Sequence, residues 1–216
     1  TIAVGEVAAV VSDMKQKKVR PERRNLVSHQ QVLKCLAEEE SVLPISFGTV
    51  AADEPAVQEL LSEHRLSLLA QLQRVAGRVE MGLRVTLNAP DLFAYFVETY
   101  PELRTARDRL FNGGGEPALE QKIAIGQLFE RLLGESGQTY ATQVEEVLAP
   151  CCVEIHRNAP RDEREMMHLA CLVEREAVSA FEKGVLAAAQ LFDEHFAFDY
   201  SGPWPPHHFV AVDLEV

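Results

Sequence analysis

The 216 residues are 47% hydrophobic and 25% charged, which is typical of a chain that buries a substantial core. Asp and Glu number 33 against 21 Lys and Arg, and the resulting net charge of -12 disfavours binding to the phosphate backbone of nucleic acid. No apolar run approaches the roughly 20 residues of a membrane span, so we expect a cytoplasmic protein.

The N-terminal part alternates short extended segments with amphipathic helices. Gly77 is expected to end the last of these helices. The predicted elements are a strand at Glu6–Val11, a basic loop at Lys15–Arg20, a helix from Pro21 to Glu39 that buries Leu26, Val27, Leu33 and Leu36, an extended segment at Val42–Val50, and a helix over Pro55–Ala76 capped by Asp53.

The remainder opens with the clearest two-residue alternation in the chain, from Val79 to Leu87. A helical region is predicted next, from Pro90 to Leu148, with breaks at Pro101 and Asn112–Gly115 and a bend at Gly134 and Gly137. The elements predicted after it are a hairpin of Cys151–Arg157 and Met167–Val173, a helix from Glu176 to Phe192, and a strand at Phe196–Tyr200.

This order is β-α-β-β-α-β, the ferredoxin-like plan, with an enlarged first helical crossover. The predicted class is therefore α+β, with an N-terminal α/β domain at residues 1–77 and a modified ferredoxin-like domain with a Pro-Trp tail at residues 78–216. In this plan the apolar sets that begin at Val79, Val153 and Met167 face the helices. The opposite, open face is expected to carry Glu80, Arg84, Thr86, Cys152, Glu154, His156, His168, Ala170, Leu172 and Glu174.

Candidate chemistry is sparse. Glu80, Glu154, His156 and His168 share the open face and could form a metal or acid-base cluster, but exposed polar side chains on a sheet need no such role. The sequence contains no G-x-S-x-G and no H-E-x-x-H pattern, and Gly113–Gly115 lacks the frame of a phosphate loop. Cys35, Cys151, Cys152 and Cys171 lack C-x-x-C spacing, which favours reduced structural thiols. We predict no catalytic residue, metal or cofactor.

Three segments, called here the signature segments, carry the strongest information. They are Val-Leu-Pro-Ile-Ser-Phe-Gly-Thr-Val at residues 42–50, Gly-Arg-Val-Glu-Met-Gly-Leu-Arg-Val at 77–85, and Tyr-Ser-Gly-Pro-Trp-Pro-Pro-His-His-Phe-Val at 200–210. The third holds the only Trp of the chain among three prolines, which fix an extended path. We expect the chain to turn at Gly202-Pro203 and residues 209–212 to run as a closing strand or arm. Trp204 could be an exposed binding anchor or a plug that closes the sheet, and the density of prolines favours the plug.

In this order the segments resemble those of the gas vesicle protein F/L family, accessory proteins of gas vesicle formation. Ala-Ala-Val-Val-Ser at residues 8–12 is similar to a further family motif, whereas Ser46 stands where the family has Arg. Family members carry one more strand before this point, and because the chain begins at Thr1 we expect that strand to be missing. The resemblance implies the same two domains, and interaction candidates at Pro44, Phe47, Gly48, Glu80, Arg84, Tyr200, Gly202, Pro203, Trp204, Pro205 and Pro206.

The function that the resemblance implies is nonenzymatic. The chain would bind the hydrophobic shell subunit and other gas vesicle accessory proteins, assist nucleation and assembly, and remain as a minor vesicle component, with the gas-facing surface as one location. Its acidic charge would keep such a complex in solution. The alternative is a ferredoxin-like module that binds a small molecule or regulator on its exposed sheet face.

Overall fold

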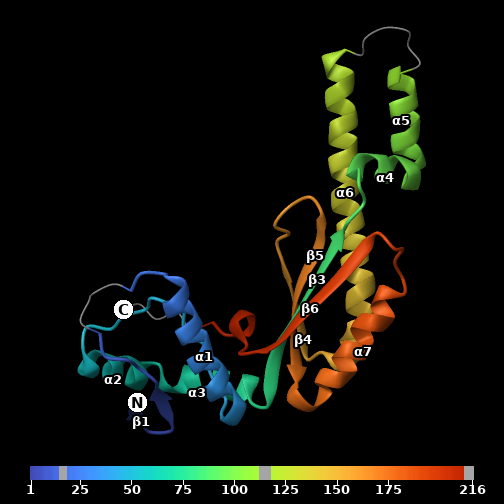
Figure 1. Cartoon of the computed structure of the whole chain (residues 1–216). Coiled ribbons are helices and arrows are strands. Elements are labelled where there is room, and N and C mark those ends of the chain that lie inside the picture. Colours follow the sequence, from blue (N-terminus) through green and yellow to red (C-terminus); the bar gives the residue numbers. More distant parts are fainter. Residues whose placement is uncertain (15–18, 112–117, 212–216) are drawn as a thin grey trace. The chain divides into compact units, whose positions relative to one another are not determined.

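The computed structural model describes residues 1–14, 19–111 and 118–211. They pack as two compact units (Figure 1). Unit 1 contains Thr1–Met81, Leu172–Glu176 and residues 202–211, and unit 2 contains Gly82–Cys171 and Ala177–Ser201. Both units are discontinuous along the chain, whereas the predicted domains are continuous, so the boundary after Gly77 stays a prediction. Parts of two predictions, residues 15–18 of the basic loop and the Gly113–Gly115 linker, lie outside the described residues.

Unit 1 begins with a hairpin rather than the single strand predicted at Glu6–Val11. Strands β1 (Ile2–Val4) and β2 (Val7–Ala9) pair antiparallel, with Ile2 opposite Ala9. The turn between them needs the positive φ of 60° that Gly5 adopts. Short strands with few alternating positions leave too little pattern for their boundaries to be predicted.

Helix α1 (Arg23–Glu39) confirms the predicted helix, but Leu33 is its only buried residue. Leu26 and Val27 are exposed, which contradicts the predicted apolar side. The helix predicted over Pro55–Ala76 divides at His64 into α2 (Glu54–Glu63) and α3 (Arg65–Val75). Asp53 caps α2 as predicted, because its carboxylate accepts the Ala56 N–H at 2.9 Å. Leu61 and Leu68 of these helices pack with Ile2 and Val7 in a core of unit 1.

The larger sheet contains β3 (Arg78–Leu87), β4 (Glu154–Asn158), β5 (Glu165–Glu174) and β6 (Phe196–Trp204), in the spatial order β4-β5-β3-β6. Between β3 and β4 come α4 (Leu92–Thr99), α5 (Pro101–Phe111) and α6 (Leu119–Leu148), and α7 (Val178–Ala189) joins β5 to β6. The element order is therefore the predicted β-α-β-β-α-β. In Figure 1, α6 continues beyond the sheet to pair with α5.

The inner sheet face follows the predicted alternation on two strands. Val79, Leu83 and Leu87 are buried on β3, and Met167, Leu169, Cys171 and Val173 are buried on β5. Val153 was expected to belong to this set, but it precedes β4 and is 47% exposed. The expected open face is also partly covered, because Glu80, Ala170 and Leu172 are buried.

Helix α6 crosses Gly126, Gly134 and Gly137 without interruption. A Cβ added at Gly126 or Gly134 would meet no atom within 4 Å, whereas at Gly137 it would lie 3.1 Å from the Met166 carbonyl oxygen. Only Gly137 is therefore required by a close approach, here of the helix to β5.

We expect Gly126→Ala to raise the free energy of unfolding by about 0.5–1 kcal/mol, because alanine favours the helix and occupies open space. The free energy of unfolding of Gly137→Ala should be about 1 kcal/mol lower than that of Gly126→Ala, because the added methyl group crowds the β5 backbone. Urea unfolding of both variants measures the difference, and equal stabilisation would contradict the close approach.

Candidate functional site

The second and third signature segments meet in unit 1 at the carboxylate of Glu80. Backbone N–H of His208 donates to Glu80 Oε2 at 2.9 Å, and His208 Nδ1 lies 2.6 Å from Glu80 Oε1. The Glu80 side chain is only 7% exposed. A carboxylate this deeply buried needs such partners, because losing hydration without them is costly. The pair therefore fixes the C-terminal segment against β3.

Glycine is required where the third signature segment passes β3. Gly202 has a φ of 128°, and a Cβ there would lie 2.7 Å from Met81 Sδ and 2.9 Å from the Glu80 carbonyl oxygen. The Gly202-Pro203 peptide is cis. The turn predicted at this dipeptide is wrong, because β6 continues through it to Trp204.

The prolines and Phe209, rather than the tryptophan, are buried in this segment. Pro205 and Pro206 are buried and Phe209 is 3% exposed, whereas Trp204 is 42% exposed. The plug prediction for Trp204 is therefore wrong. His207–Phe209 form a 3-10 turn instead of the start of a strand, and Val212 lies outside the described residues. Beyond the turn, Ala211 N–H donates to Gln71 Oε1 at 2.9 Å.

The first signature segment approaches the same region through His29 of α1. His29 Nε2 lies 3.1 Å from the Ile45 carbonyl oxygen, and its ring meets Phe47 edge-on with centroids 5.6 Å apart. The pKa of His207 depends in part on three nearby charges, those of Glu80, His208 and His29. Its loss of hydration lowers its pKa, with Glu80 opposing that shift and both histidines adding to it. Sequence reasoning missed His29 because it lies outside all three signature segments.

The remaining sequence candidates have plainer surroundings. Pro44 is half-buried, Gly48 sits in a turn with a φ of 95°, and Tyr200 is 46% exposed. Ser46, at the position of the family arginine, is exposed, and its carbonyl accepts the Thr49 N–H at 3.3 Å and the Thr49 hydroxyl at 3.0 Å.

Arg84 meets a buried carboxylate that the sequence did not single out. Its Nε lies 3.5 Å from Glu165 Oε2, and His168 Nδ1 lies 3.4 Å from Glu165 Oε1. Glu165 and His168 are three residues apart and would face opposite ways in a regular strand. Moreover, two backbone hydrogen bonds join the ends of these strands, one from Leu87 N–H to the Arg164 carbonyl and one from Arg175 N–H to the Gly77 carbonyl. Between these two bonds, β5 is one residue longer than β3. Both observations indicate a β-bulge, which simple alternation cannot reveal.

The side chains considered as a metal or acid-base cluster have other partners. The described ranges contain no group of three or more His, Cys, Asp or Glu side chains able to hold a metal ion. Glu80 pairs with His208 and His168 pairs with Glu165. Burial raises the pKa of Cys151 to about 11, with the neighbouring Cys152 thiol adding to the shift, so Cys151 stays a protonated thiol at neutral pH.

Removing the Glu80 carboxylate tests the attachment of the C-terminal segment. We expect Glu80→Ala to lower the free energy of unfolding by about 2–4 kcal/mol, because both contacts with His208 are lost. His208→Ala should cost about 1–2 kcal/mol, since its backbone N–H can still donate. Urea unfolding followed by the fluorescence of Trp204 reports both changes. Glu59→Ala is the control, because Glu59 is exposed. A Glu80→Ala variant as stable as this control would contradict the attachment.

The histidine beside this pair predicts a pH dependence. Because the folded-state pKa of His207 is below its ordinary value of 6.5, the unfolded chain binds more protons as the pH falls. This contribution to stability is present above pH 6.5 and is lost as the pH falls through the folded-state pKa. Between pH 7.5 and 5, His207→Gln should therefore lose less stability than the unmodified chain in urea titrations. If both proteins lost the same stability over this pH range, His207 would not be the source of the pH dependence.

Comparisons with known proteins agree with the signature segments. The family model described as gas vesicle synthesis protein GvpL/GvpF matches residues 1–211. The chain is 28% identical to gas vesicle protein F of Streptomyces sp. (strain CB03234), over 95% of this chain and 85% of that protein. It is also 28% identical to gas vesicle protein F of Dolichospermum flosaquae, over 97% of this chain and 86% of that protein.

A solved structure extends the likeness to the fold. The crystal structure of the gas vesicle protein GvpF from Anabaena sp. PCC7120 superposes with a TM-score of 0.83 and 27% identity, over 94% of this chain and 83% of that chain. Because a family model covers nearly the whole length and a member's fold is shared, the chain belongs to the GvpL/GvpF family of gas vesicle synthesis proteins, and this membership implies a role in gas vesicle formation.

Proposed function

We propose that the chain is a nonenzymatic accessory protein that binds the hydrophobic shell subunit of gas vesicles, assists its nucleation and assembly, and remains in the vesicle as a minor component at the gas-facing surface. Other accessory proteins of the vesicle are further partners. Within this proposal, residues 1–77 form the family's α/β domain and residues 78–216 its modified ferredoxin-like domain. Family membership supports the setting.

The observation that carries the binding proposal is the exposure of Trp204 on a firmly held segment. The segment is held on both sides of Trp204. Before it, Gly202 lies close against β3, and after it, the His208 N–H donates to the Glu80 carboxylate. Because its backbone is already ordered, the tryptophan can bind an apolar partner with little further loss of conformational entropy. Tryptophan is also enriched among the residues that dominate the energy of protein interfaces.

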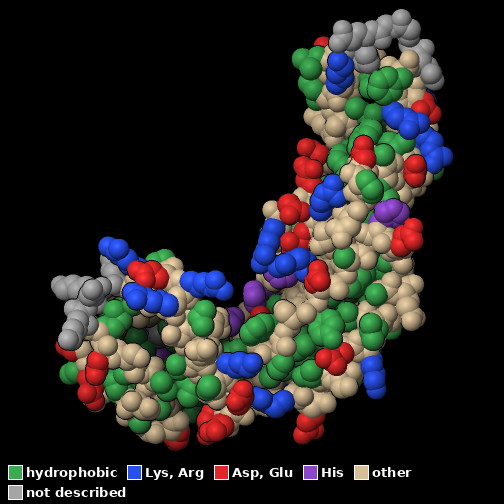
Figure 2. Space-filling model, in the orientation of Figure 1, with side chains coloured by type: hydrophobic (Ala, Val, Ile, Leu, Met, Phe, Trp, Pro, Cys, Tyr) green, Lys and Arg blue, Asp and Glu red, His purple; other side chains and the backbone are tan. Residues whose placement is uncertain are grey.

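Charge supports a protein partner over nucleic acid. The net charge of -12 repels phosphate backbones and would help to keep a bound apolar subunit in solution. On the face drawn in Figure 2, acidic and basic side chains are interspersed over α5 and α6 rather than gathered by sign. No helix in the described parts of the chain has the length and apolar character needed to cross a membrane.

Replacing the tryptophan separates binding from stability. We expect Trp204→Ala to cost only about 1–2 kcal/mol of unfolding free energy, because the side chain is 42% exposed in the folded state. It should raise, by about tenfold or more, the concentration of this protein that halves the aggregation of purified shell subunit, measured by light scattering.

Leu186→Ala is the control, because Leu186 is another exposed apolar residue, on α7. If the unmodified chain neither suppresses aggregation nor co-purifies with the shell subunit, the binding proposal is wrong. If Trp204→Ala acts like the unmodified chain, the shell subunit binds elsewhere.

A further inference from the structure

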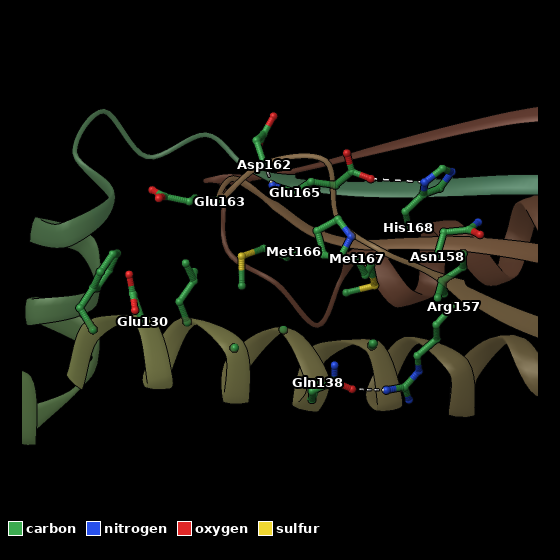
Figure 3. Close-up of a pocket in the computed structure, with 17 residues that line it drawn as sticks. Glu130, Gln138, Arg157, Asn158, Asp162, Glu163, Glu165, Met166, Met167 and His168 are labelled. Atoms are coloured by element: carbon green, nitrogen blue, oxygen red, sulfur yellow. Dashed lines mark hydrogen bonds and ion pairs between the residues drawn. The ribbon is translucent and has the colours of Figure 1, made fainter. Parts of the chain in front are cut away.

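Unit 2 contains a cavity of about 380 Å³ between α6 and the β4–β5 hairpin (Figure 3). This volume lies within the range of pockets that bind ligands. Gly134, Gly137 and Ala141 are among the α6 residues that line it, and an added Cβ at Gly134 would meet no atom within 4 Å. Every residue of its lining belongs to unit 2, whereas Trp204 belongs to unit 1.

The floor of the cavity is apolar and adaptable. Met166 and Met167 project from β5 toward α6 in Figure 3, and Phe129 and Leu133 line the helix side. Methionine is unbranched and polarizable, so it packs against apolar groups of varied shape. The floor is therefore suited to an apolar side chain from a partner.

One end of the cavity carries two exposed carboxylates. Glu130 on α6 and Glu163 in the hairpin both lie to the left of Met166 in Figure 3. Neither forms a hydrogen bond or an ion pair with any described residue. The cation of the lining, Arg157, is already bound by Glu145 at 2.7 Å and by Gln138 at 2.7 Å. This end of the cavity thus offers two carboxylates to an incoming cation. The lining of the cavity therefore combines an apolar floor with a pair of carboxylates.

We infer that this cavity is a docking site for a segment of the shell subunit in which an apolar side chain is flanked by Lys or Arg. The apolar side chain enters over Met166 and Met167, and the neighbouring cation pairs with Glu130 and Glu163. The inference rests on the proposed function and adds a second contact, on unit 2, to the one proposed at Trp204.

Filling the cavity tests the inference. Because Gly134 lines the cavity and an added Cβ there meets no atom within 4 Å, Gly134→Phe places an aromatic ring at the cavity wall without a clash at its Cβ. The matched control is Gly126→Phe, on the same helix, where an added Cβ also meets nothing and which does not line the cavity. The readout is the concentration that halves the aggregation of purified shell subunit. Gly134→Phe should raise it by about tenfold or more, and Gly126→Phe by less than about twofold.

The outcomes separate this inference from the proposed function. If the unmodified chain and Gly126→Phe suppress aggregation and Gly134→Phe does so equally well, the cavity is not the docking site and the proposed function stands. If the unmodified chain has no effect on the shell subunit, the proposed function fails and this inference fails with it. Circular dichroism establishes whether Gly134→Phe is folded.

A charge exchange tests the same site without filling it. We expect Glu130→Lys combined with Glu163→Lys to weaken binding by about fivefold or more at low salt, and added salt should narrow the difference. Glu146→Lys with Glu194→Lys changes the net charge equally on unit 2 but away from the lining, and should have a smaller effect. Equal effects of the two double variants would overturn the assignment of the cation to this end of the cavity. This comparison decides the matter even if Gly134→Phe does not fold.

Discussion

The buried carboxylate of Glu80 is the constraint on which the organisation of the C-terminal segment depends. Removing this charge from water is unfavourable unless hydrogen bonds replace its hydration, and His208 supplies two of them. The chain must therefore return to β3 after β6, although more than one hundred residues separate the two signature segments. Gly202 makes the return possible, because any side chain at that position would collide with Met81.

This anchoring gives the proline-rich segment a different role from that of a hydrophobic plug. Pro205, Pro206 and Phe209 supply its buried surface, while the tryptophan remains accessible. A rigid backbone that presents an aromatic side chain resembles the ordered anchors that contribute most to binding energy at interfaces. The docking proposed at the cavity also relies on a preformed site, since Gly134 on α6 leaves room for a partner's side chain beside adaptable methionines.

Regular, half-buried elements were the part of the fold that could be predicted. The alternation from Val79 to Leu87 identified β3, and the cap at Asp53 marked the start of α2. Prediction was weaker where the pattern was short or irregular. The β1–β2 hairpin has only three residues in each strand, and the bulge in β5 brings Glu165 and His168 to one face. Residues of the candidate site were named from motifs, but their contacts were not predictable.

By itself, the sequence determined the order of β-α-β-β-α-β elements and the position of the Pro-Trp segment, and its signature segments resembled those of one family. These follow from local residue types and spacing, which are readable along the chain. Only the tertiary structure decided that Glu80 binds His208, that Trp204 is exposed and that a cavity forms between α6 and the β4–β5 hairpin. Burial and pairing across long separations depend on how elements pack, and no local pattern encodes which polar group will lose its water.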